Sequence, residues 1–137
     1  MEANDYYKRI MELADLDVEP KTMAESRTIL DELEEREEEL KNLHLELKRD
    51  IRYIEAVYLK RKREQNQVFN QNQDVIPKKR FGKKKESRVM VLKKLENEKK
   101  EVLEPYYKVR TMAEQLLNEM NDAKKPLQDF VIDKMGL

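Results

Sequence analysis

A dense run of positive charge near the middle of the chain is the feature best suited to chemistry. Residues 78–85 read Lys-Lys-Arg-Phe-Gly-Lys-Lys-Lys and place six bases in eight positions. Closely spaced lysines and arginines neutralise nucleic-acid phosphates, and a ring among them can stack on an exposed base. We therefore predict a nucleic-acid interface, with RNA favoured over DNA, that comprises Lys60, Arg61, Lys62, Arg63, Lys78, Lys79, Arg80, Phe81, Lys83, Lys84, Lys85 and Arg88.

The same run has other interpretations. It fits an acidic protein surface as the partner, a localisation signal, or a solvated turn that binds nothing. Gly82 allows close approach of the backbone to a phosphate, and the amide-rich residues 65–74 beside the run add hydrogen-bonding groups. The pattern therefore leaves nucleic acid and an acidic protein surface as the two partner classes.

Catalytic chemistry has little to build on in this sequence. The chain has one histidine, His44, and no cysteine, and it lacks the phosphate-binding glycine loop, the nucleophile elbow and the zinc-binding helix motif. Glutamates are abundant, but an acid–base pair needs burial to separate its two pKa values. We expect no enzyme activity, no cofactor and no metal. His44 is expected at the edge of a helix contact, with a pH-sensitive polar layer as the alternative.

The composition indicates that helices position these residues. Charged residues make up 42% of the chain against about 25% in ordinary domains, and only two glycines and four prolines are present among 137 residues. Such a chain predicts a single all-α domain. Its zero net charge hides an asymmetry, because residues 1–50 carry a net of −8, residues 51–100 a net of +10 and residues 101–137 a net of −2.

The order of apolar residues and breakers predicts five segments. These are a short helix over 4–15, a long helix over 22–64, a basic and amide-rich loop over 65–85, a long helix over 86–121 and a short helix over 125–135. Pro105 falls inside the second long helix. Because the apolar row stays in phase across it, we predict a kink in one continuous helix.

Each long helix carries a heptad row, with steps of three and four residues. Paired in antiparallel order, the two rows have residue numbers that sum to 149 or 150. This pattern predicts a long antiparallel helical hairpin, resembling a coiled coil, with the two short helices packed at its base. The rows are Leu33, Glu37, Leu40, His44, Leu47, Ile51, Ile54 and Tyr58, and Leu92, Leu95, Lys99, Val102, Tyr106, Val109, Ala113 and Leu116.

Three functional hypotheses follow. The first is a non-enzymatic adaptor that binds RNA or a ribonucleoprotein through the basic loop. The second is a structural coiled-coil scaffold with an incidental loop. A homodimer is expected, because apolar residues such as Leu45 and Leu59 widen the stripe beyond one partner helix. The third is a holdase chaperone: the hairpin loosely resembles prefoldin-type subunits, but residues 65–85 lack the strand-forming alternation of that family, so we do not adopt the resemblance.

No run of apolar residues approaches the length of a membrane span, and the acidic start of the chain is unlike a signal peptide. We therefore expect a cytoplasmic protein that does not contact a membrane.

Overall fold

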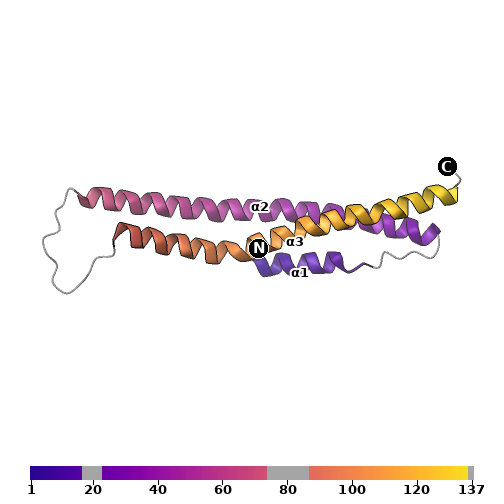
Figure 1. Ribbon diagram of the computed structural model, residues 1–137, viewed down its shortest axis with the longest axis horizontal. Helices are drawn as coiled ribbons and strands as arrows, with labels where there is room; N and C mark the ends of the chain where they lie inside the picture. Colours follow the sequence, from indigo (N-terminus) through magenta and orange to yellow (C-terminus); the bar gives the residue numbers. More distant parts are fainter. Residues whose placement is uncertain (17–22, 74–86, 136–137) are drawn as a thin grey trace. The chain divides into compact units, whose positions relative to one another are not determined.

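The computed structural model describes residues 1–16, 23–73 and 87–135, and the regular elements among them are all α-helices. Helix α1 spans Ala3–Ala14, α2 spans Met23–Gln73 and α3 spans Arg88–Met135 (Figure 1). The chain divides into two compact units: unit 1 comprises Met1–Arg49 and Pro105–Leu137, and unit 2 comprises Asp50–Glu104. The all-α prediction is confirmed for this part of the chain.

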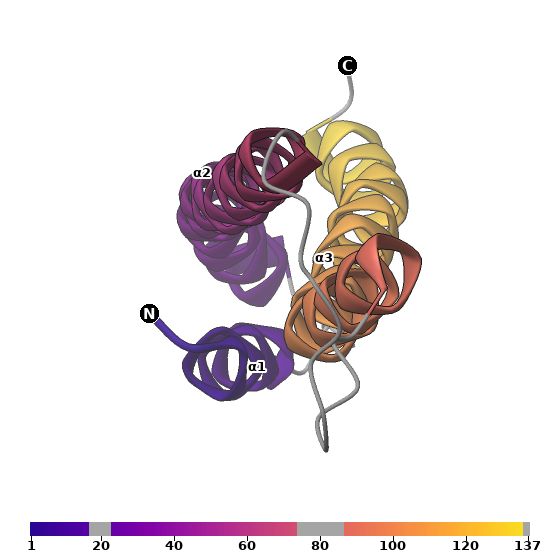
Figure 2. The same cartoon turned by 90° about the vertical axis from the view of Figure 1, so that its left-hand side faces the viewer.

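Unit 1 contains α1 in addition to parts of α2 and α3, and α1 lies beside both (Figure 2). Its apolar residues recur at helical spacing, so Tyr6, Ile10 and Leu13 share one face and are buried. The hydroxyl of Tyr106 donates to the carbonyl oxygen of Met1 at 3.2 Å, which places the start of α1 against the first turns of the α3 segment in this unit. We predicted that the N-terminal helix packs at the base of a hairpin, whereas α1 contacts Tyr106 of α3 at its start and Arg36 of α2 at its end.

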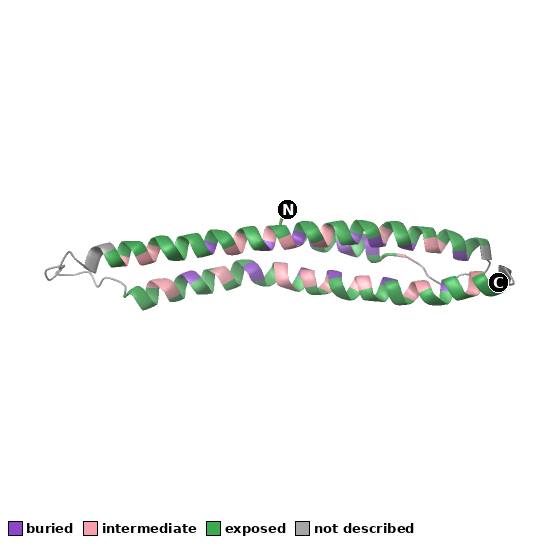
Figure 3. Cartoon of the chain, turned by 90° about the horizontal axis from the view of Figure 1, so that it is seen from above, coloured by how far each residue is buried: buried purple, intermediate pink, exposed green. Residues whose placement is uncertain are grey.

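The predicted apolar row of α2 is confirmed. All eight positions from Leu33 to Tyr58 are buried or half-buried (Figure 3). Within each unit, side-chain contacts between α2 and α3 pair rising residue numbers on α2 with falling residue numbers on α3. Glu37 meets Lys124 and His44 meets Glu114 in unit 1, while Tyr58 meets Glu98 in unit 2 and Asn66 meets Arg88. The two helices therefore run antiparallel within each unit.

The apolar row of α3 differs from the prediction at one position. Val102 is 38% exposed, whereas its neighbour Leu103 is 1% exposed and fills the core position. From Leu95 the row steps by four to the half-buried Lys99 and by four again to Leu103. Residues four apart form the ridges by which helices commonly pack. Here two successive steps of four residues replace the alternating steps of four and three that a strict heptad requires.

Helix α2 ends at Gln73, not at residue 64 as we predicted. The amide-rich residues have only moderate helix propensity, but here they find tertiary partners. The side-chain oxygens of Asn66 and Asn70 accept hydrogen bonds from Arg88, and Phe69 is half-buried. These contacts favour the additional turns of helix.

Helix α3 runs without interruption to Met135, so the predicted turn after residue 121 and the separate helix over 125–135 are wrong. Pro105 and Pro126 both lie inside it, which confirms that the helix continues past Pro105. Proline removes one intrahelical hydrogen bond, yet the row of core contacts continues on both sides of Pro126. Lys124 pairs with Glu37 and Leu127 is 3% exposed, and this packing outweighs the break that Pro126 suggests in sequence.

Candidate nucleic-acid interface

The predicted interface divides between described and undescribed residues. Residues 78–85, which carry six of the predicted bases and Phe81, lie outside the described residues. Helices α2 and α3 precede and follow that segment along the chain, and they carry the other predicted residues. These are Lys60, Arg61, Lys62, Arg63 and Arg88, all within unit 2 and all exposed.

Arg61 is held by a network inside unit 2. Its Nη1 atom lies 3.0 Å from Oε1 of Glu98 and its Nη2 atom 3.4 Å from Oε2, while the Tyr58 hydroxyl donates to the same carboxylate at 3.2 Å. The guanidinium carbon also lies 5.2 Å from the centre of the Tyr58 ring. Arg61 lowers the pKa of Glu98, and burial, followed by Glu98, raises the pKa of Tyr58. The charge of Arg61 is thus already matched by an acid.

Arg88 has a positioning contact at the start of α3. Its Nε and Nη2 atoms donate to Oδ1 of Asn66 at 3.1 and 2.7 Å, and its Nη1 atom reaches Oδ1 of Asn70 at 3.5 Å. The Ser87 hydroxyl oxygen accepts from the Met90 amide at 3.2 Å, which is an N-cap of α3. These contacts fix the start of α3 against the last turns of α2, but they leave the positive charge of Arg88 unneutralised.

Lys60, Lys62 and Arg63 have none of the side-chain contacts that hold Arg61 and Arg88. All three are exposed, and none forms an ion pair with a residue that the structure describes. Lys62 borders a cavity of about 90 Å³ that Tyr58 and Leu95 also line, which has too little room for a ligand of substrate size. Their ammonium and guanidinium groups are therefore suited to contact with an extended anionic partner.

The unit boundary coincides with a division of charge. Unit 2 has 16 lysines and arginines against nine aspartates and glutamates, a net of +7, and unit 1 has 13 against 20, a net of −7. Unit 2 includes bases that we did not single out from sequence, of which Arg52 is one. The net charge of residues 51–100 was the signal that could have found them.

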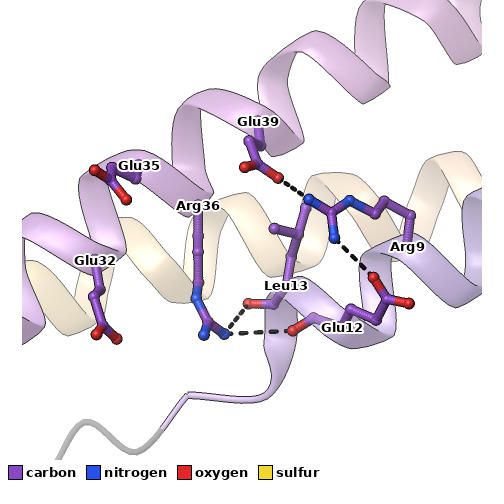
Figure 4. A pocket seen from close by; sticks show the side chains of 7 residues that line it. All are labelled: Arg9, Glu12, Leu13, Glu32, Glu35, Arg36 and Glu39. Carbon is purple, nitrogen blue, oxygen red and sulfur yellow. Dashed lines mark hydrogen bonds and ion pairs between the residues drawn. The ribbon is translucent and has the colours of Figure 1, made fainter.

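The acidic side of unit 1 has a cleft of about 330 Å³ between α1 and α2 (Figure 4). Arg9 bridges Glu12 and Glu39, with the Glu12 pair at 2.7 Å. These two acids raise the pKa of Arg9. The Nη1 atom of Arg36 lies 2.6 Å from the Asp15 carbonyl oxygen and 3.3 Å from that of Leu13, so it satisfies the open end of α1. The cleft is thus built from contacts that dock α1.

His44 has one acidic partner among the described residues. Nε2 of the half-buried His44 on α2 lies 3.1 Å from Oε1 of the exposed Glu114 on α3, within unit 1. In residues 1–16, 23–73 and 87–135, no group of three or more histidines, aspartates and glutamates gathers closely enough to hold a metal ion. None of the described helices contains an apolar stretch of the length that a membrane span requires.

Comparisons of the chain with protein-family models, with curated proteins and with solved structures returned no match.

Proposed function

We propose that the protein is a non-enzymatic helical adaptor that binds nucleic acid, with RNA favoured, through unit 2. The observation that carries the proposal is the net charge of +7 on unit 2 together with three exposed bases, Lys60, Lys62 and Arg63, that pair with no described residue. An excess of positive charge attracts a polyanion and gives an affinity that falls steeply with salt.

The binding groups act on the phosphates. Lys60, Lys62 and Arg63 contribute from α2, and residues 78–85 contribute the densest charge of the chain. Arg61 contributes little, because Glu98 already neutralises it. Phosphate contacts of this kind position a strand without reading its sequence, so we expect broad sequence tolerance.

The test is fluorescence anisotropy with labelled single-stranded RNA and DNA over a salt series. Each phosphate contact contributes a log–log slope of about −0.7 for a single strand, so four to six contacts give a slope of about −3 to −4. Replacing the six bases at 78–85 with glutamine is expected to abolish most of the binding. The Lys60→Gln/Arg63→Gln variant should flatten the slope by about 1.4, that is, by two contacts.

The matched control is Lys8→Gln/Lys125→Gln, which removes two exposed bases from unit 1 and lowers the total charge equally. Binding should be nearly unchanged in this variant. If the full chain binds neither RNA nor DNA at low salt, the proposal is wrong. An acidic protein surface would then be the partner class to pursue, with the same variants as reagents.

A structural scaffold is the second candidate function, and exposed apolar side chains favour it. Leu45 is 54% exposed and Leu59 49%, at the two positions expected to widen the apolar stripe of a homodimer, and Val57 beside them is 37% exposed. Sedimentation equilibrium of the full chain and of Leu59→Gln tests this proposal. A homodimer that the substitution weakens supports it, and a monomer at all concentrations contradicts it.

A further inference from the structure

The outward side of α2 in unit 2 carries one aromatic ring among its positive charges. At 100° per residue, the helix directs Arg52, Tyr53, Lys60 and Arg63 away from the buried Tyr58. All four are exposed, and Glu64 is the acid that shares this side. The four residues, called here the outer face of α2, lie within 12 residues of helix, and the first and last are about 16 Å apart along the axis at a rise of 1.5 Å per residue.

Tyr53 is the most exposed tyrosine of the chain, ahead of Tyr7 at 43%. It is 72% exposed, whereas Tyr6 and Tyr58 are buried, and Tyr107 lies under Arg110 with the guanidinium 4.9 Å from its ring centre. The Tyr53 hydroxyl has no hydrogen-bond partner among the described residues. Its neighbours one turn along, Ala56 and Val57, leave the ring exposed. The ring therefore has room for a flat group to stack on it.

We infer that the outer face of α2 binds single-stranded nucleic acid, with a base stacked on Tyr53 and the adjoining phosphates held by Arg52, Lys60 and Arg63. The inference rests on the proposed function and deepens it by naming the form of the ligand. Aromatic stacking with backbone charge contacts is how proteins bind single strands without sequence preference. A duplex keeps its bases stacked inside, so it offers this face only its phosphates.

The spacing along the helix is compatible with this assignment. Lys60 lies two turns beyond Tyr53, about 10 Å along the helix axis. Arg52 immediately precedes Tyr53 in the chain. Neither Arg52 nor Lys60 forms an ion pair with a described residue. Both side chains are therefore available to phosphates on either side of the stacked nucleobase. A single exposed ring predicts one stacked base at this face.

The experiment compares three probes of equal length: a labelled oligothymidylate, the same strand with abasic residues throughout, and a duplex. The abasic strand keeps the phosphates but has no base to stack. Tyr53→Ala is expected to weaken oligothymidylate binding at least about fivefold, with the salt slope unchanged, and to leave the abasic strand unaffected. Tyr53→Phe should keep the affinity, because stacking needs the ring and not the hydroxyl. Tyr7→Ala, at an exposed tyrosine of unit 1, is the matched control.

A second variant reports stacking directly. The chain has no tryptophan, so Tyr53→Trp introduces a single indole whose fluorescence a stacked base should quench. Quenching by oligothymidylate and not by the abasic strand supports the inference. Equal losses for both strands in Tyr53→Ala, no loss for either, or preference for the duplex would overturn the inference while leaving the proposed function standing. Failure of every probe, and of single-stranded RNA, to bind the native chain at low salt would overturn both.

Discussion

The Nζ atom of Lys124 lies 2.8 Å from Oε2 of Glu37, and this ion pair joins α3 to α2 within unit 1. Glu37 occupies a position in the apolar row and is only 9% exposed. Lys41, one turn along α2, adds a second ammonium group at 3.0 Å. Two cations thus keep a carboxylate charged in a place where leucine would be expected.

Removing one partner of this pair should be costly. Lys124→Met leaves the carboxylate with Lys41 alone, and we expect the free energy of unfolding to fall by about 1–3 kcal/mol in urea titrations. The exposed neighbour substitution Lys125→Met should change it by less than about 0.5 kcal/mol. A double variant, Glu37→Met/Lys124→Met, should regain much of the loss, because it removes both charges from the half-buried site. Equal effects of Lys124→Met and Lys125→Met would contradict the structural role of the pair.

The same carboxylate predicts a pH dependence of stability. Lys124 chiefly, and Lys41, lower the pKa of Glu37 below its ordinary value of 4.5, while burial acts in the opposite direction. A lowered pKa in the folded state means that the unfolded chain takes up the proton first. The stabilisation is therefore complete above pH 4.5 and is lost as the pH falls through the folded pKa. Unfolding measured from pH 7 to pH 3 should show Glu37→Gln to be less stable at neutral pH, with the difference vanishing in acid. Parallel profiles for the two proteins would refute this.

Arg36 should control how firmly α1 is docked. Its guanidinium donates to the carbonyl oxygens of Leu13 and Asp15 and reaches that of Glu12 at 3.4 Å. Arg36→Met leaves these carbonyl groups to water, and we expect the amides of residues 3–14 to exchange hydrogen about five times faster, equivalent to about 1 kcal/mol. Arg49→Met is the control, since Arg49 is exposed on the same helix and pairs with no described residue. Uniformly faster exchange throughout unit 1 would show that the effect is global and not confined to α1.

Substitutions at Leu103 and Val102 distinguish the predicted heptad row from the observed packing of α3. Leu103→Ala removes a side chain that is 1% exposed and should cost about 2–5 kcal/mol of unfolding free energy. Val102→Ala acts on a side chain that is 38% exposed and should cost less than about 1 kcal/mol. Thermal and denaturant unfolding of the two variants checks this order. The reverse order would restore the strict heptad row at this part of α3.

Glu98 should limit the charge that unit 2 presents to a nucleic acid. Glu98→Gln removes an acid and releases Arg61 from its ion pair. If Arg61 then contacts a phosphate, the anisotropy titrations should give tighter binding and a log–log slope steeper by about 0.7. Glu55→Gln, on the same unit, removes an equal charge without touching the network of Tyr58, Arg61 and Glu98, and it should raise the affinity less. Indistinguishable slopes for the two variants would argue against a contact from Arg61.

The spacing of apolar residues along the sequence was sufficient to predict the helices and most of the buried core residues. The row from Leu33 to Tyr58 is buried because apolar residues at steps of three and four can share only one side of a helix. The ends of the helices were not predictable in the same way. The composition of residues 65–73 is typical of a loop, and these residues are helical where Asn66 accepts a hydrogen bond from Arg88 of α3. Pro126 likewise suggests a helix break, and the helix continues there because Lys124 pairs with Glu37 of α2.

For the candidate interface, the sequence by itself determined the excess of positive charge over residues 51–100, because charge is a property of residue type alone. Only the tertiary structure decided which of those charges are available. Arg61 is neutralised by Glu98, while Lys60, Lys62 and Arg63 pair with no described residue, although the four are consecutive in the chain. The difference arises because successive residues of a helix point in directions 100° apart, and only the packing of α2 against α3 determines which direction meets an acid and which meets solvent.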